Sequence, residues 1–138
     1  MPSDPGSLKG MAGSIVIAGI HTKARRKVVL VVDDEPLVRM NAVDMFEDMG
    51  FEVLEANDGL AALQVLEGRS DVSLLFSDCR MPGMTGPELA EVAAERWPHL
   101  RIVLVSGYIN IKPTTWPLLP KPYDAQALQQ VVSETAVA

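Results

Sequence analysis

The sequence predicts an α/β fold with a doubly wound parallel sheet, and three observations lead to this prediction. Short apolar runs rich in β-branched residues recur along the chain, as in strands that are buried on both faces. Segments with apolar residues three and four positions apart separate these runs, which is the spacing of helices that cover a sheet. Acidic residues directly follow two of the runs, at residues 28–32 and 72–77. Repeated strand–helix units imply right-handed crossovers with helices on both faces.

The first half of the chain supplies two strands, each followed by a helix. Residues 28–32 form a continuous apolar run, and Pro36 suits the first turn of the following helix, which ends at Gly50. Residues 51–55 alternate as a second strand, and the next helix ends at Gly68. The predicted inward-facing residues of these two helices are Val38, Ala42, Met45, Phe46, Met49, Ala62, Leu63 and Leu66.

The second half supplies three strands and two helices. The strands are expected at residues 72–77, 101–105 and 118–119, the last one being short. Gly86 and Pro87 open a helix that ends before Pro98, because the residue before a proline disfavours the helical conformation. A final helix is expected over residues 125–137.

Length and composition are those of a single-domain soluble protein. At 138 residues the chain is long enough to bury one core, and 48% hydrophobic with 22% charged residues is ordinary for this class. No apolar run approaches the roughly 20 residues that cross a bilayer. The basic cluster follows the apolar residues 14–20, whereas in a secretory signal it precedes them. A single cysteine, Cys79, excludes an internal disulfide, and we expect a cytoplasmic protein.

Charge is distributed unevenly along the chain and marks a domain boundary. Residues 1–27 hold five basic residues and one acidic residue, whereas residues 28–138 hold seven basic and seventeen acidic ones, a net charge of −10. We expect 1–27 to be a flexible N-terminal extension and 28–138 to be the folded domain. The basic cluster at 23–27 either docks on an acidic surface or is a solvated lead-in to the first strand. The acidic domain argues against nucleic acid as a partner.

Charged residues follow three of the predicted strands. Asp33 and Asp34 follow the first strand, Asp78 follows the third, and Lys121 follows the short fifth strand. The carboxyl ends of parallel strands meet at one edge of the sheet, where open α/β sheets bind ligands. Taken singly, the acidic pair could be helix N-terminal charge, Asp78 a turn residue and Lys121 a surface lysine. Together they predict a site for a hard divalent cation and an anion, because crowded carboxylates need a compensating charge.

At these positions the sequence resembles the receiver domains of two-component response regulators. The resemblance runs from about residue 28 to residue 132 and rests on four motifs in a fixed order. The motifs are Asp33-Asp34-Glu35-Pro36, Asp78 with Met81-Pro82-Gly83-Met84-Thr85-Gly86, Ser106-Gly107, and Lys121-Pro122-Tyr123. The resemblance implies a flavodoxin-like, five-stranded parallel sheet of order 2-1-3-4-5, which places the first and third strands side by side.

The resemblance implies that the cofactor is Mg²⁺, and it names four ligands. Asp34 would bind the ion directly, Asp33 mainly through water, and Arg80 through its backbone carbonyl only. Asp78 completes the set. The bound cation would cancel the repulsion between this carboxylate and an incoming phosphoryl group.

The resemblance also assigns the phosphoryl-transfer roles. Asp78 is the phosphoacceptor, Lys121 pairs with one phosphoryl oxygen, and the hydroxyl of Ser106 hydrogen-bonds another. A cis peptide bond is implied between Lys121 and Pro122. The implied phosphodonor is a histidine kinase or a histidine phosphotransfer protein.

One stretch departs from the family pattern. Ser106 and Lys121 are only fifteen residues apart, whereas receiver domains usually fit a full helix and two loops between these positions. Pro113 and Pro117 obstruct a regular helix across residues 109–117. We therefore expect the fourth helix of the fold to be short or absent.

The expected function is that of a stand-alone receiver. The chain ends within a few residues of the last predicted helix and contains no DNA-binding motif and no Gly-rich phosphate loop. It is expected to signal by binding a downstream protein, which the sequence does not identify, and not to be an enzyme. An aspartyl phosphohydrolase would need a general acid two residues after the nucleophile, where this chain has Arg80. The main alternative is a non-phosphorylated, receiver-like interaction module of the same fold.

Overall fold

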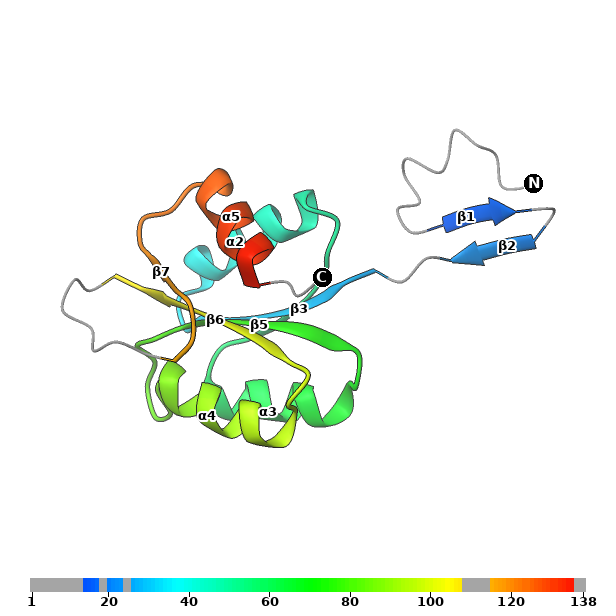
Figure 1. Cartoon of the computed structure of the whole chain (residues 1–138). Helices are drawn as coiled ribbons and strands as arrows, with labels where there is room; N and C mark the ends of the chain where they lie inside the picture. Colours follow the sequence, from blue (N-terminus) through cyan, green and yellow to red (C-terminus); the bar gives the residue numbers. More distant parts are fainter. Residues whose placement is uncertain (1–13, 18–19, 24–25, 108–114, 136–138) are drawn as a thin grey trace.

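The main sheet of the computed structural model consists of five parallel strands (Figure 1). The structure describes residues 14–17, 20–23, 26–107 and 115–135, with side chains from residue 26 onward. The strands are β3 (Val28–Val32), β4 (Glu52–Ala56), β5 (Val72–Asp78), β6 (Arg101–Ser106) and β7 (Leu118–Pro120). They lie in the order β4-β3-β5-β6-β7, which is the predicted order 2-1-3-4-5.

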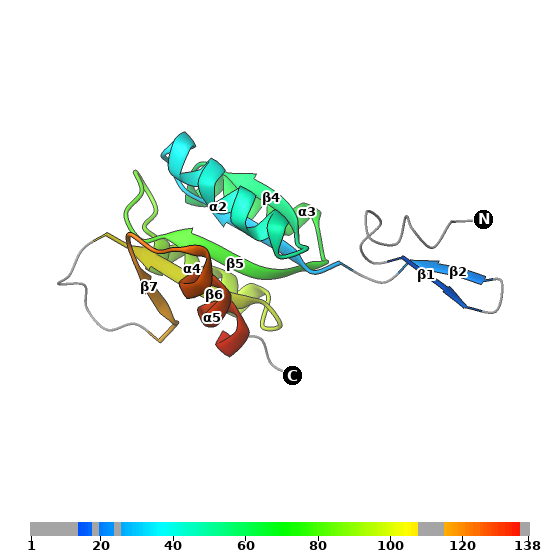
Figure 2. The ribbon, with the colours of Figure 1, turned by 90° about the horizontal axis from the view of Figure 1, so that it is seen from above.

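Two helices cover each face of the sheet, as Figures 1 and 2 show. The helices are α2 (Pro36–Asp48), α3 (Gly59–Gly68), α4 (Gly86–Arg96) and α5 (Ala125–Thr135). One apolar cluster joins the sheet to α2 and α5 through Phe46 and Leu128, both fully buried. A second cluster joins the opposite face to α3 and α4 through Ala62 and Leu89. The three layers therefore enclose two cores that share the strands between them.

The central strand β3 contributes to both cores. Leu30 and Val32 belong to the cluster under α3 and α4, whereas Val29 and Val31 belong to the cluster under α2 and α5. None of these side chains is more than 1% exposed. Successive residues of a strand point to opposite faces, so a strand covered on both sides must be apolar throughout. This explains why the sequence has a continuous apolar run here and no alternation.

A chain of aromatic rings leads from the core toward the carboxyl edge of the sheet. Phe46 on α2 packs edge-to-face against Phe51 and Phe76, with ring centroids 5.2 and 5.0 Å apart. Phe76 on β5 in turn packs edge-to-face against Tyr123, with centroids 6.0 Å apart. Such pairs add about 0.5–1.5 kcal/mol each beyond the area they bury. They fix the position of the segment that follows β7.

Side-chain caps define the starts of three helices. Asp58 accepts a hydrogen bond from the Ala61 N–H at the start of α3, over 2.8 Å. Thr85 and Glu88 form a reciprocal capping box at the start of α4. Asp124 accepts a hydrogen bond from the Ala127 N–H at the start of α5, also over 2.8 Å. Each cap satisfies helix N–H groups that have no partner within the helix.

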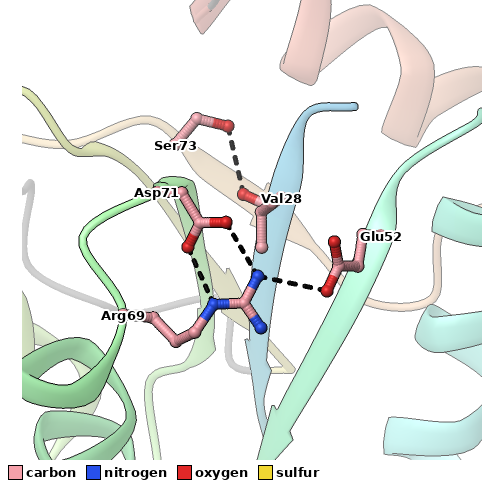
Figure 3. Close-up of polar contacts among 5 residues, drawn as sticks. All are labelled: Val28, Glu52, Arg69, Asp71 and Ser73. Carbon is pink, nitrogen blue, oxygen red and sulfur yellow. Dashed lines mark hydrogen bonds and ion pairs between the residues drawn. The ribbon is translucent and has the colours of Figure 1, made fainter. Parts of the chain in front are cut away.

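Polar contacts tie together the amino ends of three neighbouring strands (Figure 3). The Arg69 guanidinium, just before β5, donates to Asp71 over 2.8 Å and to Glu52 on the edge strand β4 over 3.1 Å. The Ser73 hydroxyl donates to the Val28 carbonyl oxygen over 3.0 Å, at the point where the pairing of β3 and β5 shifts register. These contacts lie at the end of the sheet opposite to the charged residues that follow the strands.

The fold class predicted from the sequence is confirmed, and the element bounds differ by a few residues. Most of the stretch expected to contain a short or missing fourth helix, residues 108–114, lies outside the described residues; 115–117 are not helical. Within the extension 1–27, β1 (Ser14–Ile17) and β2 (Ile20–Lys23) form a separate antiparallel sheet that the sequence analysis did not predict. The division at residue 27 stays a prediction.

Candidate functional site

The carboxyl edge of the sheet gathers the charged residues singled out in the sequence. Asp33 directly follows β3, and Asp78 is the last residue of the neighbouring strand β5. Ser106 ends β6, and Lys121 directly follows β7. Asp33, Asp78 and Ser106 are almost completely buried, although all three are polar. Buried polar groups of this kind at strand ends indicate a site and not a packing role.

Lys121 is the cation that joins the two buried carboxylates. Its Nζ lies 3.4 Å from Oδ1 of Asp78 and 3.6 Å from Oδ2 of Asp33. The Lys121 N–H donates to the Ser106 carbonyl oxygen over 2.7 Å, which extends the pairing of β6 and β7 to the site. The peptide bond between Lys121 and Pro122 is cis, as the resemblance implies.

A close approach of backbone segments supports the Asp78 end of the site. The Gly86 N–H, at the start of α4, donates to the Cys79 carbonyl oxygen over 2.9 Å. A Cβ at Gly86 would collide with the Asp78 carbonyl oxygen and would lie 2.8 Å from the Cys79 Cα. Both obstacles are backbone atoms, which cannot turn aside. Only glycine lets α4 begin this close to the end of β5.

The two partners of the central ion pair both have shifted pKa values. Burial raises the pKa of Asp78 above that of an ordinary carboxyl group, and the nearby Asp33 charge adds to this, although Lys121 opposes it. Burial alone would lower the pKa of Lys121, but the charges of Asp78 and Asp33 outweigh it and raise this pKa. The lysine therefore stays protonated, and ionised Asp78 is held at an energetic cost.

The pKa values of two further side chains are also raised by burial and by these charges. Burial, together with the Asp33 and Asp78 charges, raises the pKa of Tyr123 to about 12. Burial and the Asp78 charge raise the pKa of the Cys79 thiol to about 11, so this thiol is un-ionised and inert at neutral pH. Cys79 is buried within the core, where it packs as a small apolar residue.

Carboxylate oxygens of Asp33, Glu35 and Asp78 lie within 4.8 Å of one another. An all-oxygen set of this spacing fits a hard divalent cation such as Mg²⁺, and the negative charge favours one. Asp34 is exposed and lies outside this group; it lines an adjoining hollow together with Arg80 and Thr85. Of the four ligands that the resemblance names, the structure therefore brings together Asp33 and Asp78, while Asp34 and Arg80 share the hollow beside them.

Glu35 is the member of this cluster for which the sequence predicts no role. It stands in the motif Asp33-Asp34-Glu35-Pro36, between the predicted ligands and the helix. Its N–H donates to Oδ1 of Asp33 over 2.9 Å, so the chain makes a local turn directly after β3. This short turn brings the Glu35 carboxylate toward the cluster. Three successive acids before Pro36 were the available signal.

The comparison with known protein families identifies the family of this domain. The profile of the response regulator receiver domain matches residues 29–133. The chain belongs to this family. It is a receiver domain of two-component signalling. Domains of this family bind Mg²⁺ at an acidic site, and this chain has a cluster of acidic residues at the carboxyl edge of its sheet. No helix within the described parts of the chain is long and apolar enough to cross a membrane.

Individual relatives place the receiver in several kinds of signalling protein. The sensor kinase CckA of Brucella abortus is 34% identical over 114 residues, which cover 77% of this chain but 12% of the kinase. The response regulator receiver protein CpdR of the same organism is 29% identical over 119 residues, covering 81% of this chain and 98% of CpdR. The crystal structure of the receiver domain from the hybrid histidine kinase CckA has a TM-score of 0.69 and 37% identity, covering 78% of this chain and 97% of that one. This chain spans about a quarter or less of several other relatives.

Proposed function

We propose that this protein accepts a phosphoryl group on Asp78 and that the phosphorylated form signals by binding another protein. The observation that carries the proposal is the placement of the Lys121 ammonium 3.4 Å from Asp78 and 3.6 Å from Asp33, at the carboxyl edge of the sheet. A lysine in this position offsets part of the negative charge of the pocket before an anion arrives. The same ammonium is then available to pair with a phosphoryl oxygen.

The transfer step uses groups of this chain on the acceptor side. A carboxylate oxygen of Asp78 attacks the phosphorus of a phosphohistidine on the donor protein. An O–P bond forms as the P–N bond breaks, and the electron pair of that bond returns to the donor's imidazole nitrogen. Lys121 follows β7, and Ser106 ends the neighbouring strand β6. The Lys121 ammonium and the Ser106 hydroxyl bind the phosphoryl oxygens as negative charge develops on these oxygens.

The site also provides for a divalent cation. Asp33 and Asp78, with either Asp34 or Glu35, would hold Mg²⁺, and the Arg80 carbonyl would add a neutral oxygen. When bound, Mg²⁺ supplies positive charge that offsets the repulsion between the carboxylates and the incoming phosphoryl group. Burial raises the pKa of Asp78, and a bound cation would lower this pKa by favouring the ionised carboxylate.

The partners follow from the chemistry of the step. The donor would be a histidine kinase or a histidine phosphotransfer protein in the cytoplasm, and the receiver of the signal a downstream protein that recognises phosphorylated Asp78. The acidic domain carries no basic footprint for nucleic acid, since residues 28–138 have a net charge of −10. Phosphorylation makes this surface still more negative, which favours a basic partner.

Incubation with Mg²⁺ and acetyl phosphate, followed by intact mass measurement, tests the proposal. Wild type should gain the mass of one phosphoryl group, and Asp78→Asn should gain none, because the amide has the same shape but cannot attack phosphorus. Asp44→Asn, a change at an exposed carboxylate on α2, is the matched control and should label like wild type. Absence of labelling in wild type would support an inert interaction module, and continued release of phosphate without an adduct would support a phosphohydrolase.

A further inference from the structure

Arg39 makes an unusual pair of contacts beside the site. It lies on α2, one turn after Pro36, and its side chain is only 19% exposed. Its Nη1 donates to the backbone carbonyl oxygen of Asp33 over 2.7 Å, and its Nε donates to Oε1 of Glu55 on β4 over 3.0 Å. One guanidinium thus connects the loop that carries the acids to the neighbouring edge strand.

The Asp33 carbonyl marks the point where β3 leaves the sheet. The Asp33 N–H still donates to the Ala56 carbonyl oxygen over 3.2 Å, as in the pairing of β3 with β4. The Asp33 carbonyl oxygen instead accepts from Arg39. The acids that follow are therefore carried by a turn beyond the sheet, and the sheet itself does not fix the peptide between Asp33 and Asp34.

Two other hydrogen bonds connect this turn to the start of α2. Oδ1 of Asp33 accepts from the Glu35 N–H over 2.9 Å, and the Glu35 carbonyl oxygen accepts from the Arg39 N–H over 2.9 Å. The second of these is the first backbone hydrogen bond of α2, which any residue other than proline at position 39 would make, so the contact specific to Arg39 is that of its guanidinium with the Asp33 carbonyl oxygen.

We propose that Arg39 is the positioning residue of the acid loop, holding Asp33, Asp34 and Glu35 in the arrangement that binds the cation. The inference rests on the proposed Mg²⁺-dependent function and adds a residue to it. In this role Arg39 acts through its hydrogen bond to the Asp33 carbonyl oxygen, which fixes the peptide that carries the ligands. The planar guanidinium fork suits this role because it satisfies two acceptors at once, which a lysine ammonium on a flexible stem does less well.

Two substitutions at Arg39 distinguish an effect of its hydrogen-bond geometry from an effect of its charge. Arg39→Met removes the donors and keeps the apolar stem, whereas Arg39→Lys keeps the charge but replaces the fork with one nitrogen. The matched control is Arg96→Met, which removes an exposed arginine ion pair with Glu67 (2.6 Å) on another helix. Calorimetric titration with Mg²⁺ should show affinity lowered about tenfold in both Arg39 variants, a loss typical of residues that support metal ligands. Arg96→Met should stay within about twofold of wild type.

Hydrogen exchange of the Glu35 N–H, measured without Mg²⁺, provides a readout that is independent of the proposed function. Both Arg39 variants should exchange this proton faster than wild type and Arg96→Met, because the turn is no longer closed. Unchanged exchange and unchanged Mg²⁺ affinity in both variants would overturn the inference. The inference would also be overturned if Arg39→Lys bound Mg²⁺ as tightly as wild type while Arg39→Met bound it more weakly, because the charge of residue 39 would then be sufficient. If wild type itself does not bind Mg²⁺, the proposed function fails, whereas faster exchange would still support Arg39 as the closure of the turn.

Discussion

At the scale of single residues, the site is defined by charges that the fold holds close together against their mutual repulsion. Asp78 has a raised pKa despite the lysine 3.4 Å away, which means that burial and the second carboxylate outweigh the ion pair. The folded protein consequently binds this proton more tightly than the unfolded chain does. As pH rises from the ordinary carboxyl pKa through the raised one, ionisation of Asp78 lowers the free energy of unfolding.

Asp78→Asn should therefore stabilise the protein in the absence of Mg²⁺. Near neutral pH the variant should unfold at a higher denaturant concentration than wild type, because it lacks the buried charge whose cost raises the Asp78 pKa. The gain should shrink in acid, where Asp78 of the wild type becomes protonated. Denaturant unfolding at several pH values measures both effects, with Asp44→Asn as the control. A variant less stable than wild type at neutral pH would show that the ion pair with Lys121 dominates.

The choice of metal ligand between Asp34 and Glu35 is a second question at this scale. The resemblance names Asp34, whereas the structure places the Glu35 carboxylate in the cluster with Asp33 and Asp78. We expect Asp34→Ala to weaken Mg²⁺ binding more than Glu35→Ala, because Asp34 shares its hollow with Arg80, whose carbonyl is the fourth implied ligand. Titrations of the two variants under the same conditions decide between them. The reverse order would assign the ion to the Asp33, Glu35 and Asp78 oxygens.

At the scale of elements, the site depends on where strands and helices meet. The sequence predicted that Gly86 and Pro87 open a helix, and α4 begins there. It could not predict that this start touches the backbone of Asp78 and Cys79, because that contact depends on how α4 packs and not on local spacing. The same holds for Arg39 and Arg69, whose partners on β4 are sixteen and seventeen residues away in the sequence. Strand ends are local features and were predictable, whereas these contacts of Gly86, Arg39 and Arg69 with distant elements were not.

Gly86→Ala should damage both stability and phosphoryl acceptance. The added methyl group meets backbone atoms, so α4 must move away from the end of β5, which costs about 1–3 kcal/mol as overpacking does. Gly68→Ala is the control: it also lies at a helix end, but a Cβ there would meet nothing within 4 Å. Thermal unfolding and acetyl phosphate labelling report the two effects. If Gly86→Ala is as stable as Gly68→Ala and labels normally, the close approach is not required.

At the scale of the whole molecule, the two apolar cores hold the strands and helices together, and the carboxyl edge of the sheet gathers the charged residues. The cores follow from patterns visible in the sequence, since a strand apolar at every position must be covered on both faces, as β3 is. The convergence of Asp33, Asp78 and Lys121 followed from the topology once the strand order was known. The position of Glu35 did not follow, because a tight turn, and not the sheet, sets its direction. Sequence patterns thus describe the framework more completely than the loops it carries.

Because the proposed cation site would join the segments that follow β3 and β5, its occupancy should raise the free energy of unfolding of the whole domain. A ligand that binds only the folded state adds about 2.7 kcal/mol when its concentration is one hundred times the dissociation constant. Mg²⁺ should therefore raise the Tm of wild type by several degrees, and by less in Asp78→Asn, which has lost a ligand and part of the repulsion that the cation relieves. The stability difference between the two proteins should narrow as Mg²⁺ is added.

Potassium chloride at equal ionic strength is the control, because general screening of the acidic domain acts with any salt. An equal rise of Tm with both salts would mean that the carboxylates at the sheet edge respond to screening alone and do not form a specific cation site.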